Sequence, residues 1–306
     1  MDVTRLSDPS SIFSAKDLVI VITGGGSGIG HAMAAAVYKT GAAKVYILGR
    51  RHDVLTKAAK AIDPTGTVVV PLQCDVDSIA SVTAAGQAIE HETGYIDVLI
   101  NNAARPGHPF PPPAQTIDDL KSQFLTGMDD GSALSCFQTN AMSVIAVSGI
   151  FLPLLDKGNQ RRGWQGGKIS MDEARKRTRV PGIDEDDART SQIISVSSVS
   201  AYEKSAMAGL PYSAGKAAVS YIASAMATLL TPWGIRSNTF VPGLYLTEMT
   251  SGIAPTNGIP VSSIPAGQPG GLDTVAGVVL YLVGKGGSFT NGGVVQQDGG
   301  QGVVSF

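Results

Sequence analysis

The first hundred residues alternate short, mostly apolar runs with longer stretches in which small and polar residues recur. The apolar runs cover residues 18–22, 45–48, 68–72 and 96–100, and stretches of helical length, such as 31–40 and 78–91, separate them. Continuous apolar runs of this length are typical of strands buried on both faces of a parallel sheet. The alternation predicts an α/β fold: a single doubly wound Rossmann-type domain over residues 1–306, with a mostly parallel sheet of about seven strands flanked by helices.

A glycine-rich turn joins the first expected strand to the first expected helix. Its spacing is TGxxxGxG, and its candidate ligand contacts are Gly24, Ser27, Gly28, Ile29 and Gly30. Because such a turn carries few side chains, its backbone amides can approach a pyrophosphate at the positive end of the helix. The motif predicts a dinucleotide site, and a glycine turn without a ligand is the alternative.

The residues at the end of the second expected strand indicate which dinucleotide the site binds. In dinucleotide-binding folds an acidic residue at this point binds the adenosine ribose hydroxyls, whereas an Arg accommodates a 2′-phosphate. Here Gly49 stands at the acidic position and Arg50 follows it. We therefore expect NADP(H) rather than NAD(H), unless Arg50 and Arg51 are simply a solvated surface pair.

A second group of residues suggests acid–base chemistry. Tyr212 and Lys216 are four residues apart in a stretch of helical composition, so both side chains lie on one helix face. A free phenol has a pKa of roughly 10, and a nearby ammonium lowers it towards the range of a useful acid or base. Ser198, after the apolar run 193–196, offers a hydroxyl that could bind a carbonyl oxygen. A packed Tyr and a solvated Lys are the alternative.

Composition narrows the remaining possibilities. The charged fraction is 16% and the net charge is −2, which gives no reason to expect a nucleic acid or a membrane as a partner. Cys74 and Cys136 form no CxxC pair, and the four His show no ligand spacing, so we expect no metal site. Residues 1–17 lack the apolar core of a signal peptide, and no run reaches the roughly 18 apolar residues of a membrane span. A cytoplasmic enzyme is the default expectation.

In their order and spacing, these motifs make the chain resemble the short-chain dehydrogenase/reductase family from about Leu18 to Gly300. The matching residues are Thr23–Gly30, Cys74-Asp75-Val76, Asn101-Asn102-Ala103, Asn140, Ser198, Tyr212 with Lys216, Pro242-Gly243 with Thr247, and Gln297–Gly300. The resemblance implies an oxidoreductase with a Ser–Tyr–Lys–Asn catalytic tetrad. It also implies a homodimer or homotetramer that packs through the helix from Tyr212 to Leu230.

The resemblance also assigns individual roles. Asp75 and its neighbour Val76 would contact the adenine, and Asn102 would line the cofactor path. Asn140 would complete the tetrad and hold a water in a proton relay with Lys216. Lys216 would bind the nicotinamide ribose and Thr247 the nicotinamide carboxamide. Tyr212, Pro242 and Gly243 would complete the cofactor site.

Three features depart from the family pattern. Ala104 replaces the usual Gly after Asn101-Asn102-Ala103, and Ser197 and Ser200 compete with Ser198 for the hydroxyl role. The third feature is a charged insertion, 156–191. Within it, Ser170–Glu173 has the pattern of a capping box opening a short basic helix that ends at Pro181-Gly182. We expect a solvated surface loop at the amino ends of the strands, with an oligomer contact or partner site as the alternative.

Three segments should follow carboxyl ends of strands and enclose the substrate: 105–114, 199–211 and a lid, 244–271. Their apolar residues are Phe110, Val199, Tyr202, Met207, Leu210, Leu244, Tyr245, Leu246, Met249, Ile253, Ile259 and Ile264. The sequence thus predicts an NADPH-dependent enzyme interconverting a ketone and a secondary alcohol on a fairly bulky apolar substrate, as in natural-product metabolism. Two alternatives remain: a non-redox isomerase, lyase or cyclase on the same scaffold, and a regulatory protein that binds NADP(H) without turnover.

Overall fold

The computed structural model describes residues 8–108, 114–204, 208–251 and 258–304. Seven parallel strands form one sheet in the order β3-β2-β1-β4-β5-β6-β7. They are β1 (Val19–Thr23), β2 (Lys44–Gly49), β3 (Val69–Gln73), β4 (Val98–Asn101), β5 (Gln192–Val196), β6 (Arg236–Pro242) and β7 (Val294–Gln297). The order reverses between β1 and β4, which creates the crevice where doubly wound sheets bind their ligands. The predicted fold class is confirmed.

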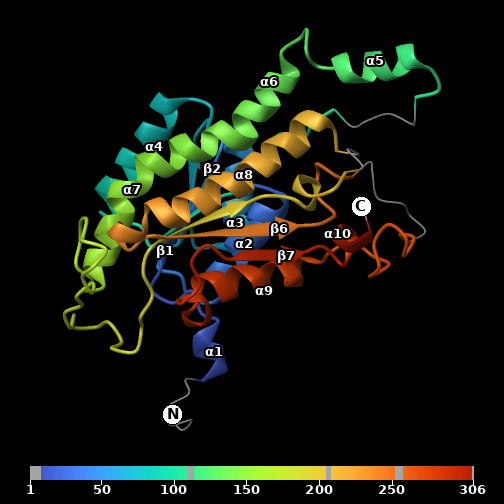
Figure 1. Ribbon diagram of the computed structural model, residues 1–306. Coiled ribbons are helices and arrows are strands. Elements are labelled where there is room, and N and C mark those ends of the chain that lie inside the picture. The colour runs from blue at the N-terminus through green and yellow to red at the C-terminus, as the bar shows by residue number, and fades with distance from the viewer. Residues whose placement is uncertain (1–7, 109–113, 205–207, 252–257, 305–306) are drawn as a thin grey trace.

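Helices cover both faces of the sheet (Figure 1). The main ones are α2 (Gly28–Lys39), α3 (His52–Ile62), α4 (Ile79–Glu92), α7 (Ser143–Arg161), α8 (Leu210–Leu229) and α9 (Leu272–Val283). Helices α2, α3 and α9 pack on one face, and α4, α7 and α8 pack on the other. Strand β1 supplies both cores, because Ile20 and Ile22 point to the first face while Val19 and Val21 point to the second.

Shorter elements complete the chain. They are α1 (Pro9–Ile12), α5 (Ile117–Leu125), α6 (Ser132–Phe137), the π-helical turn η2 (Gln138–Met142), the 3-10 turns η3 (Val199–Ala201), η4 (Thr231–Trp233) and η5 (Lys285–Gly287), and α10 (Gln301–Val304). Helix α5 is stabilised at its start by a capping box between Thr116 and Asp119, buries no residue and extends away from the sheet (Figure 1).

One helical stretch passes the length and hydropathy criteria for a membrane span. It runs from Ser132 to Arg161, and it is the single such stretch within the described ranges. In the folded chain 56% of its apolar window is buried. Val147, Phe151 and Leu155 on this stretch belong to the core against β4, β5 and α4. Burying each side chain of this kind stabilises the fold by roughly 1.5–3 kcal/mol, so core packing accounts for the apolar composition.

The charged insertion differs from the sequence expectation in two respects. The basic helix expected after Ser170–Glu173 is absent, because the described residues between α7 and β5 form turns and one isolated bridge between Trp164 and Arg177. The physical reason lies in the basic side chains. Arg175 and Arg177 donate to main-chain carbonyls of other segments, and Arg177 also lies 5.2 Å from the Trp164 ring centroid. A short helix without a buried apolar face cannot compete with these bonds.

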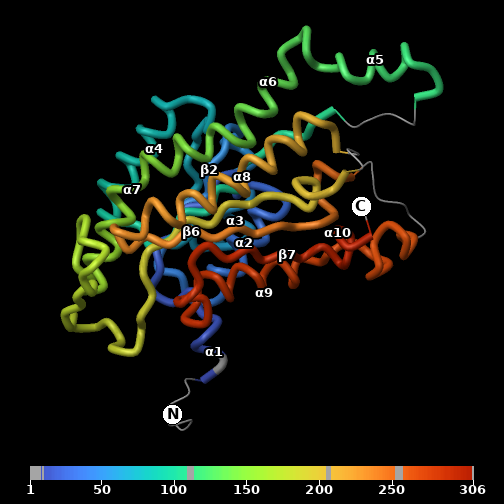
Figure 2. The backbone as a smooth tube through the Cα atoms, in the orientation of Figure 1, coloured from blue at the N-terminus to red at the C-terminus, as the bar shows by residue number. Residues whose placement is uncertain are grey.

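The second difference is burial at both ends of the insertion. Its middle is mostly exposed, as expected, but Arg162, Asp187 and Arg189 are buried. Arg162 pairs with Asp97 at 3.0 Å and with Asp187 at 2.6 Å, and Arg189 pairs with Asp187 at 2.7 Å. Asp97 directly precedes β4 and Arg189 lies just before β5, so the contacts fix the insertion to the amino ends of these strands, opposite α10 (Figure 2).

Candidate active site

The glycine turn after β1 packs so closely that side chains cannot be added at two of its positions. Gly24 has a φ of +66°, and a Cβ there would lie 2.9 Å from Nδ2 of Asn102. A Cβ on Gly30 would lie 2.3 Å from the Gly24 carbonyl oxygen. Asn102 holds the turn from the other side, because its Nδ2 donates to the Thr23 and Gly24 carbonyls at 3.0 and 3.2 Å. The sequence thus fixes the turn against the end of β4.

The turn leads into the amino end of α2, which is open to an anion. Ser27 is the N-cap residue, its side chain makes no capping hydrogen bond, and the first turn of α2 carries no acidic residue. The first amides of a helix have no partners within the helix, and the helix dipole favours negative charge there. Gly28, with a φ of +54°, lies beneath Thr247, whose methyl group would be 3.1 Å from an added Cβ. This arrangement fits a pyrophosphate.

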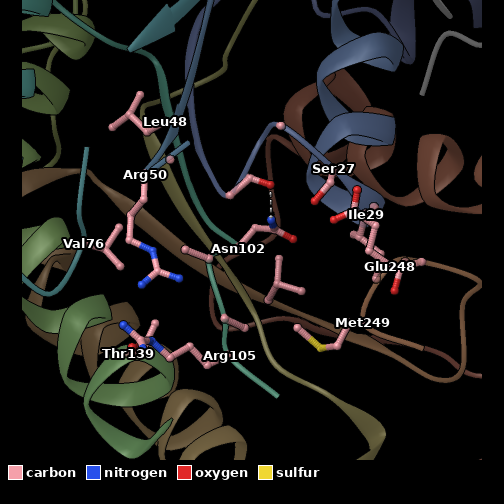
Figure 3. Close-up of a pocket in the computed structure, with 18 of the residues that line it drawn as sticks. Ser27, Ile29, Leu48, Arg50, Val76, Asn102, Arg105, Thr139, Glu248 and Met249 are labelled. Atoms are coloured by element: carbon pink, nitrogen blue, oxygen red, sulfur yellow. Dashed lines mark hydrogen bonds between the residues drawn. The ribbon is translucent and has the colours of Figure 1, made fainter. Parts of the chain in front are cut away.

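A cleft runs from this turn along the carboxyl edge of the sheet (Figure 3). Its lining includes most of the predicted cofactor residues: Gly24, Ser27, Gly28, Ile29, Arg50, Asp75, Val76, Asn102, Tyr212, Lys216, Pro242 and Thr247. Gly30 and Gly243 lie behind the surface, where Gly30 packs on Gly24 and an added Cβ on Gly243 would meet Asp298. These two glycines therefore act on the shape of the cleft and not on a ligand directly.

The two arginines after β2 have different surroundings. Arg51 forms an exposed ion pair with Glu248 at 3.3 Å, which joins the β2 end to the segment after β6. Arg50 extends into the cleft between Val76 and Arg105 (Figure 3). Within the described part of the chain, no carboxylate pairs with Arg50. One cation therefore remains available to an anionic ligand at this end of the cleft.

Asp75 and Val76 follow β3 at the far end of the cleft, and the Asp75 amide donates to Ser81 Oγ at 3.0 Å. Asp77 beside them was not predicted. It accepts hydrogen bonds from Thr139 at 2.7 Å and from Arg105 at 3.3 Å. Arg105, expected from the sequence to face the substrate, thus lies in the cleft with its charge compensated.

Tyr212 and Lys216 lie on one face of α8, as their spacing predicted. The Lys216 Nζ is 5.9 Å from the Tyr212 ring centroid and donates to the Val196 carbonyl at 2.8 Å. Burial lowers the pKa of Lys216 to about 8. Burial also raises the pKa of Tyr212 above its usual value, although hydrogen bonding with Ser198 opposes the shift. Desolvation thus outweighs the hydrogen bond with Ser198, and the Tyr212 pKa is not lowered as its spacing from Lys216 suggested.

Hydrogen bonding distinguishes Ser197 from Ser198 among the serines after β5. Ser197 is buried, donates to the Lys216 carbonyl at 2.8 Å and shares a 2.8 Å hydrogen bond with Ser220. Its hydroxyl is therefore committed to joining β5 to α8. The Ser198 hydroxyl is the one that affects Tyr212, and it also accepts from the Ser200 amide at 3.2 Å at the start of η3.

Asn140 lies in the π-helical turn between α6 and α7 and is buried. Its side chain binds the main chain of Arg105 at both ends: Oδ1 accepts from the amide at 2.7 Å and Nδ2 donates to the carbonyl at 2.9 Å. π-Helical turns of this kind occur frequently at functional sites. Neither Asn140 nor Ser198 lines the cleft itself, but both contact residues that do.

Comparison with known proteins identifies this arrangement. A family model described as short chain dehydrogenase matches residues 18–164, and one described as Enoyl-(Acyl carrier protein) reductase matches residues 181–301. The short-chain dehydrogenase/reductase PhomF of Diaporthe leptostromiformis is 35% identical over 303 residues, covering 95% of this chain and 94% of the relative. The chain belongs to the short-chain dehydrogenase/reductase family. VdtF of Byssochlamys spectabilis, another member, is 34% identical over 300 residues, with the same coverage.

Solved structures of family members share the fold. The RhlG/NADP complex of Pseudomonas aeruginosa is 22% identical, with a TM-score of 0.74, over 95% of this chain and 99% of that one. An actinorhodin polyketide ketoreductase with NADPH is 24% identical, with a TM-score of 0.70, over 94% and 98%. As an oxidoreductase of this family, the chain has the cleft at the switch point of its sheet, where the fold places ligands.

Sequence reasoning missed some residues of this short-chain dehydrogenase/reductase site. Asp77 and Thr139 line the cleft and form a side-chain hydrogen bond with each other. An acidic residue two positions after Asp75 was a weak signal for Asp77. Thr139 gave none, because the two residues become neighbours only through the fold. Glu248, which also lines the cleft, lies in the lid expected at 244–271. No group of three or more His, Cys, Asp or Glu that could hold a metal occurs in the described ranges.

Proposed function

We propose that this short-chain dehydrogenase/reductase uses NADP(H) to interconvert a ketone and a secondary alcohol. The observation that carries the proposal is the position of Tyr212 and Lys216 in the lining of the cleft that begins at the glycine turn, with the Ser198 hydroxyl beside Tyr212. A phenol, a buried ammonium and a second hydroxyl form a site that can donate a proton to a carbonyl oxygen and bind it at the same time.

The cofactor assignment rests on the cleft. Gly24, Gly28 and the open end of α2 fit a pyrophosphate, and Arg50 would bind a 2′-phosphate because its guanidinium can form two parallel hydrogen bonds with it. Related folds solved with NADP or NADPH support a nicotinamide cofactor here. Asp75 and Val76 would border the adenine, and Thr247 would reach the nicotinamide end.

The chain's own residues then account for proton transfer. Bound NADPH supplies a hydride to the carbonyl carbon. Tyr212 transfers its hydroxyl proton to the carbonyl oxygen, so that the ketone gains the two hydrogens of the alcohol. Ser198 orients this oxygen, and the ammonium of Lys216 stabilises the tyrosinate that remains. The Asn140 side chain binds the main chain of Arg105. This contact keeps the π-helical turn η2 in position beside Lys216, which returns the proton to Tyr212.

The substrate we propose is still a fairly bulky, mostly apolar carbonyl compound, but fewer side chains can contact it than the sequence suggested. Tyr245, Ile259, Ile264 and Val199 are buried in the fold and cannot form walls. Phe110, Met207 and Ile253 lie outside the described residues. Tyr202, Leu210, Leu246 and Met249 remain exposed at 41–58% and are available to an apolar ligand.

We also propose a homo-oligomer, since α6, α7 and α8 carry exposed apolar side chains. Leu134 on α6 and Tyr221 and Leu229 on α8 are 69–75% exposed, and Ile145 on α7 is 49% exposed. Sedimentation of the purified protein tests this directly: a monomer at micromolar concentration would contradict it.

A scan of NADPH oxidation against matched ketones, from small hydroxylated ones to polycyclic ones, tests the main proposal. We expect kcat/KM to rise with each added ring, because each buried methylene contributes about 0.8 kcal/mol. Product formation without NADPH consumption would identify a non-redox enzyme, and NADPH binding without any turnover would identify a regulatory protein. A tenfold preference for an anionic or small hydroxylated ketone would contradict the apolar substrate.

A further inference from the structure

The chain segment after β7 is fixed firmly against the ends of β6 and β7. Asp298 accepts hydrogen bonds from the amides of Gly300 at 3.0 Å and Gly302 at 2.7 Å, which fold the chain into the start of α10. The contact with β6 is tight, since a Cβ on Gly243 would lie 2.6 Å from the Asp298 Cα atom. Gln301, the first residue of α10, is therefore held in a defined position.

The Gln301 side chain connects two loops that are distant in sequence. Its Oε1 accepts from the Leu244 amide at 3.1 Å, and its Nε2 donates to Oε1 of Glu203 at 2.7 Å. A backbone N–H can only donate and a carboxylate only accepts, so these partners fix the orientation of the amide group. Among the hydrogen bonds of the described residues, those of Gln301 are the ones that join the two loops.

Both loops lead directly to the proposed reaction centre. Glu203 follows the η3 turn, where its amide donates to Val199 at 3.1 Å, and Ser198 begins that turn. Leu244 follows the end of β6 and precedes Thr247 by three residues. The bond to Glu203 involves a charged acceptor, which makes it stronger than a bond between neutral groups. A change in the separation of the loops would therefore move the carbonyl-binding side relative to the nicotinamide side.

We propose that Gln301 is a positioning residue that determines substrate specificity: it clasps the loops at Glu203 and Leu244 and thereby sets the width of the substrate entrance. The inference rests on the proposed ketone reduction and deepens it, because it assigns selectivity to a residue that contacts neither cofactor nor carbonyl. Each loop carries an exposed apolar side chain near its clasped residue: Tyr202 directly precedes Glu203, and Leu246 follows Leu244 by two residues. The separation of the loops would therefore decide how large a ketone these side chains can enclose.

A reciprocal exchange tests the clasp. Gln301→Glu places two carboxylates together and should open the entrance, whereas Glu203→Gln with Gln301→Glu restores an amide–carboxylate bond with donor and acceptor exchanged. For the single variant we expect KM for the preferred ketone to rise about tenfold, kcat to change less than threefold and the NADPH Kd less than twofold. The double variant should return to within threefold of wild type. Gln296→Ala is the matched control, because that amide bonds only Asp298 among the described residues.

Amide hydrogen exchange provides a second readout that does not depend on turnover. Exchange in residues 199–204 and 244–249 should be at least fivefold faster in Gln301→Glu and return in the double variant. Gln301→Met, neutral and of similar size, gives the same test should the acidic variant not fold. A double variant no better than the single one, or unchanged exchange in both single variants, overturns the clasp. A wild type that reduces no ketone overturns the proposed function instead, and exchange still decides whether the clasp exists.

Discussion

Buried charged residues are ion-paired at the amino end of the sheet, whereas a buried lysine at the carboxyl end is not. At the amino end, Asp97, Arg162, Asp187 and Arg189 are each less than a tenth exposed and neutralise one another through direct ion pairs. At the carboxyl end, Lys216 is only 3% exposed, and within the described residues no carboxylate pairs with it. Among the described residues, its one hydrogen-bond partner is the carbonyl of Val196.

The pKa shifts reflect this contrast. Although burial alone would raise it, the pKa of Asp187 is held well below its usual range by hydrogen bonds with Arg189 and the charge of Arg162. Burial lowers the pKa of Lys216 to about 8, because no carboxylate among the described residues pairs with its ammonium. A charge network that is complete in itself has a structural role, whereas an uncompensated buried charge beside a cleft marks a site that acts on a ligand.

The largest effect should follow from removing the proton donor at the carboxyl end. Tyr212→Phe keeps the ring and its packing but loses the hydroxyl, so we expect kcat to fall 10³–10⁴-fold, equivalent to about 4–5.5 kcal/mol in the barrier. NADPH binding, followed by fluorescence titration, should stay nearly unchanged. Turnover retained within about tenfold of wild type would remove Tyr212 from the mechanism.

Breaking the amino-end network should cost stability and leave catalysis intact. Arg162→Met leaves Asp97 and Asp187 buried with fewer partners, and removal of one member of a buried ion pair costs about 3–5 kcal/mol. Urea unfolding measures the loss. Lys157→Met is the control: its pair with Glu90 is half-exposed, at 48% and 51%, and such surface pairs contribute at most about 1 kcal/mol. Equal losses of unfolding free energy in the two variants would show that the buried network stabilises the fold no more than a surface ion pair does.

Arg50 and Arg51 provide a comparison within the cleft itself. Arg50→Ala should weaken NADPH binding by about 1.5–3 kcal/mol, the range of a hydrogen bond to a charged group, and leave NADH binding unchanged. Arg51→Ala, which removes only the exposed pair with Glu248, should change NADPH affinity by less than about 1 kcal/mol. Wild-type protein that binds NADH more tightly than NADPH would contradict the cofactor assignment.

Lys216 should lower stability at neutral pH, and the sign follows from its pKa. The folded state releases the Lys216 proton near pH 8, and the unfolded state releases it near the ordinary 10.5. The cost of burying the ammonium is therefore fully present below pH 8 and disappears as the pH rises towards 10.5. Lys216→Met should stabilise the inactive protein by about 1–2 kcal/mol at pH 7, after loss of the bond to Val196, with a smaller gain at pH 10. If the stability gained by Lys216→Met is the same at pH 7 and pH 10, the gain comes from packing alone and not from the buried charge.

The contrast between the two ends of the sheet also explains which features could be predicted from the sequence and which could not. Continuous apolar runs predicted the fold, and fixed local spacing predicted the glycine turn and the pair Tyr212 and Lys216. The amino-end network could not be predicted, because charged residues normally lie at the surface and the partners Asp97 and Arg162 are 65 residues apart. Apolar residues such as Ile264 were assigned to the substrate, although composition does not distinguish a cavity wall from a packed core.

The smallest effect should follow from shortening the middle of the insertion. Met171, Asp172 and Glu173 are exposed, and the ion network involves only the ends of the segment. Replacing 170–174 by two glycines keeps Arg162, Asp187 and Arg189 in place, and the closure entropy of a loop changes little with its length. We expect kcat/KM within twofold of wild type and a change in unfolding free energy below about 1 kcal/mol, because the segment lies at the end of the sheet opposite the cleft. A tenfold fall in kcat/KM of a folded variant, with its assembly state unchanged in sedimentation, would show that the amino end influences catalysis.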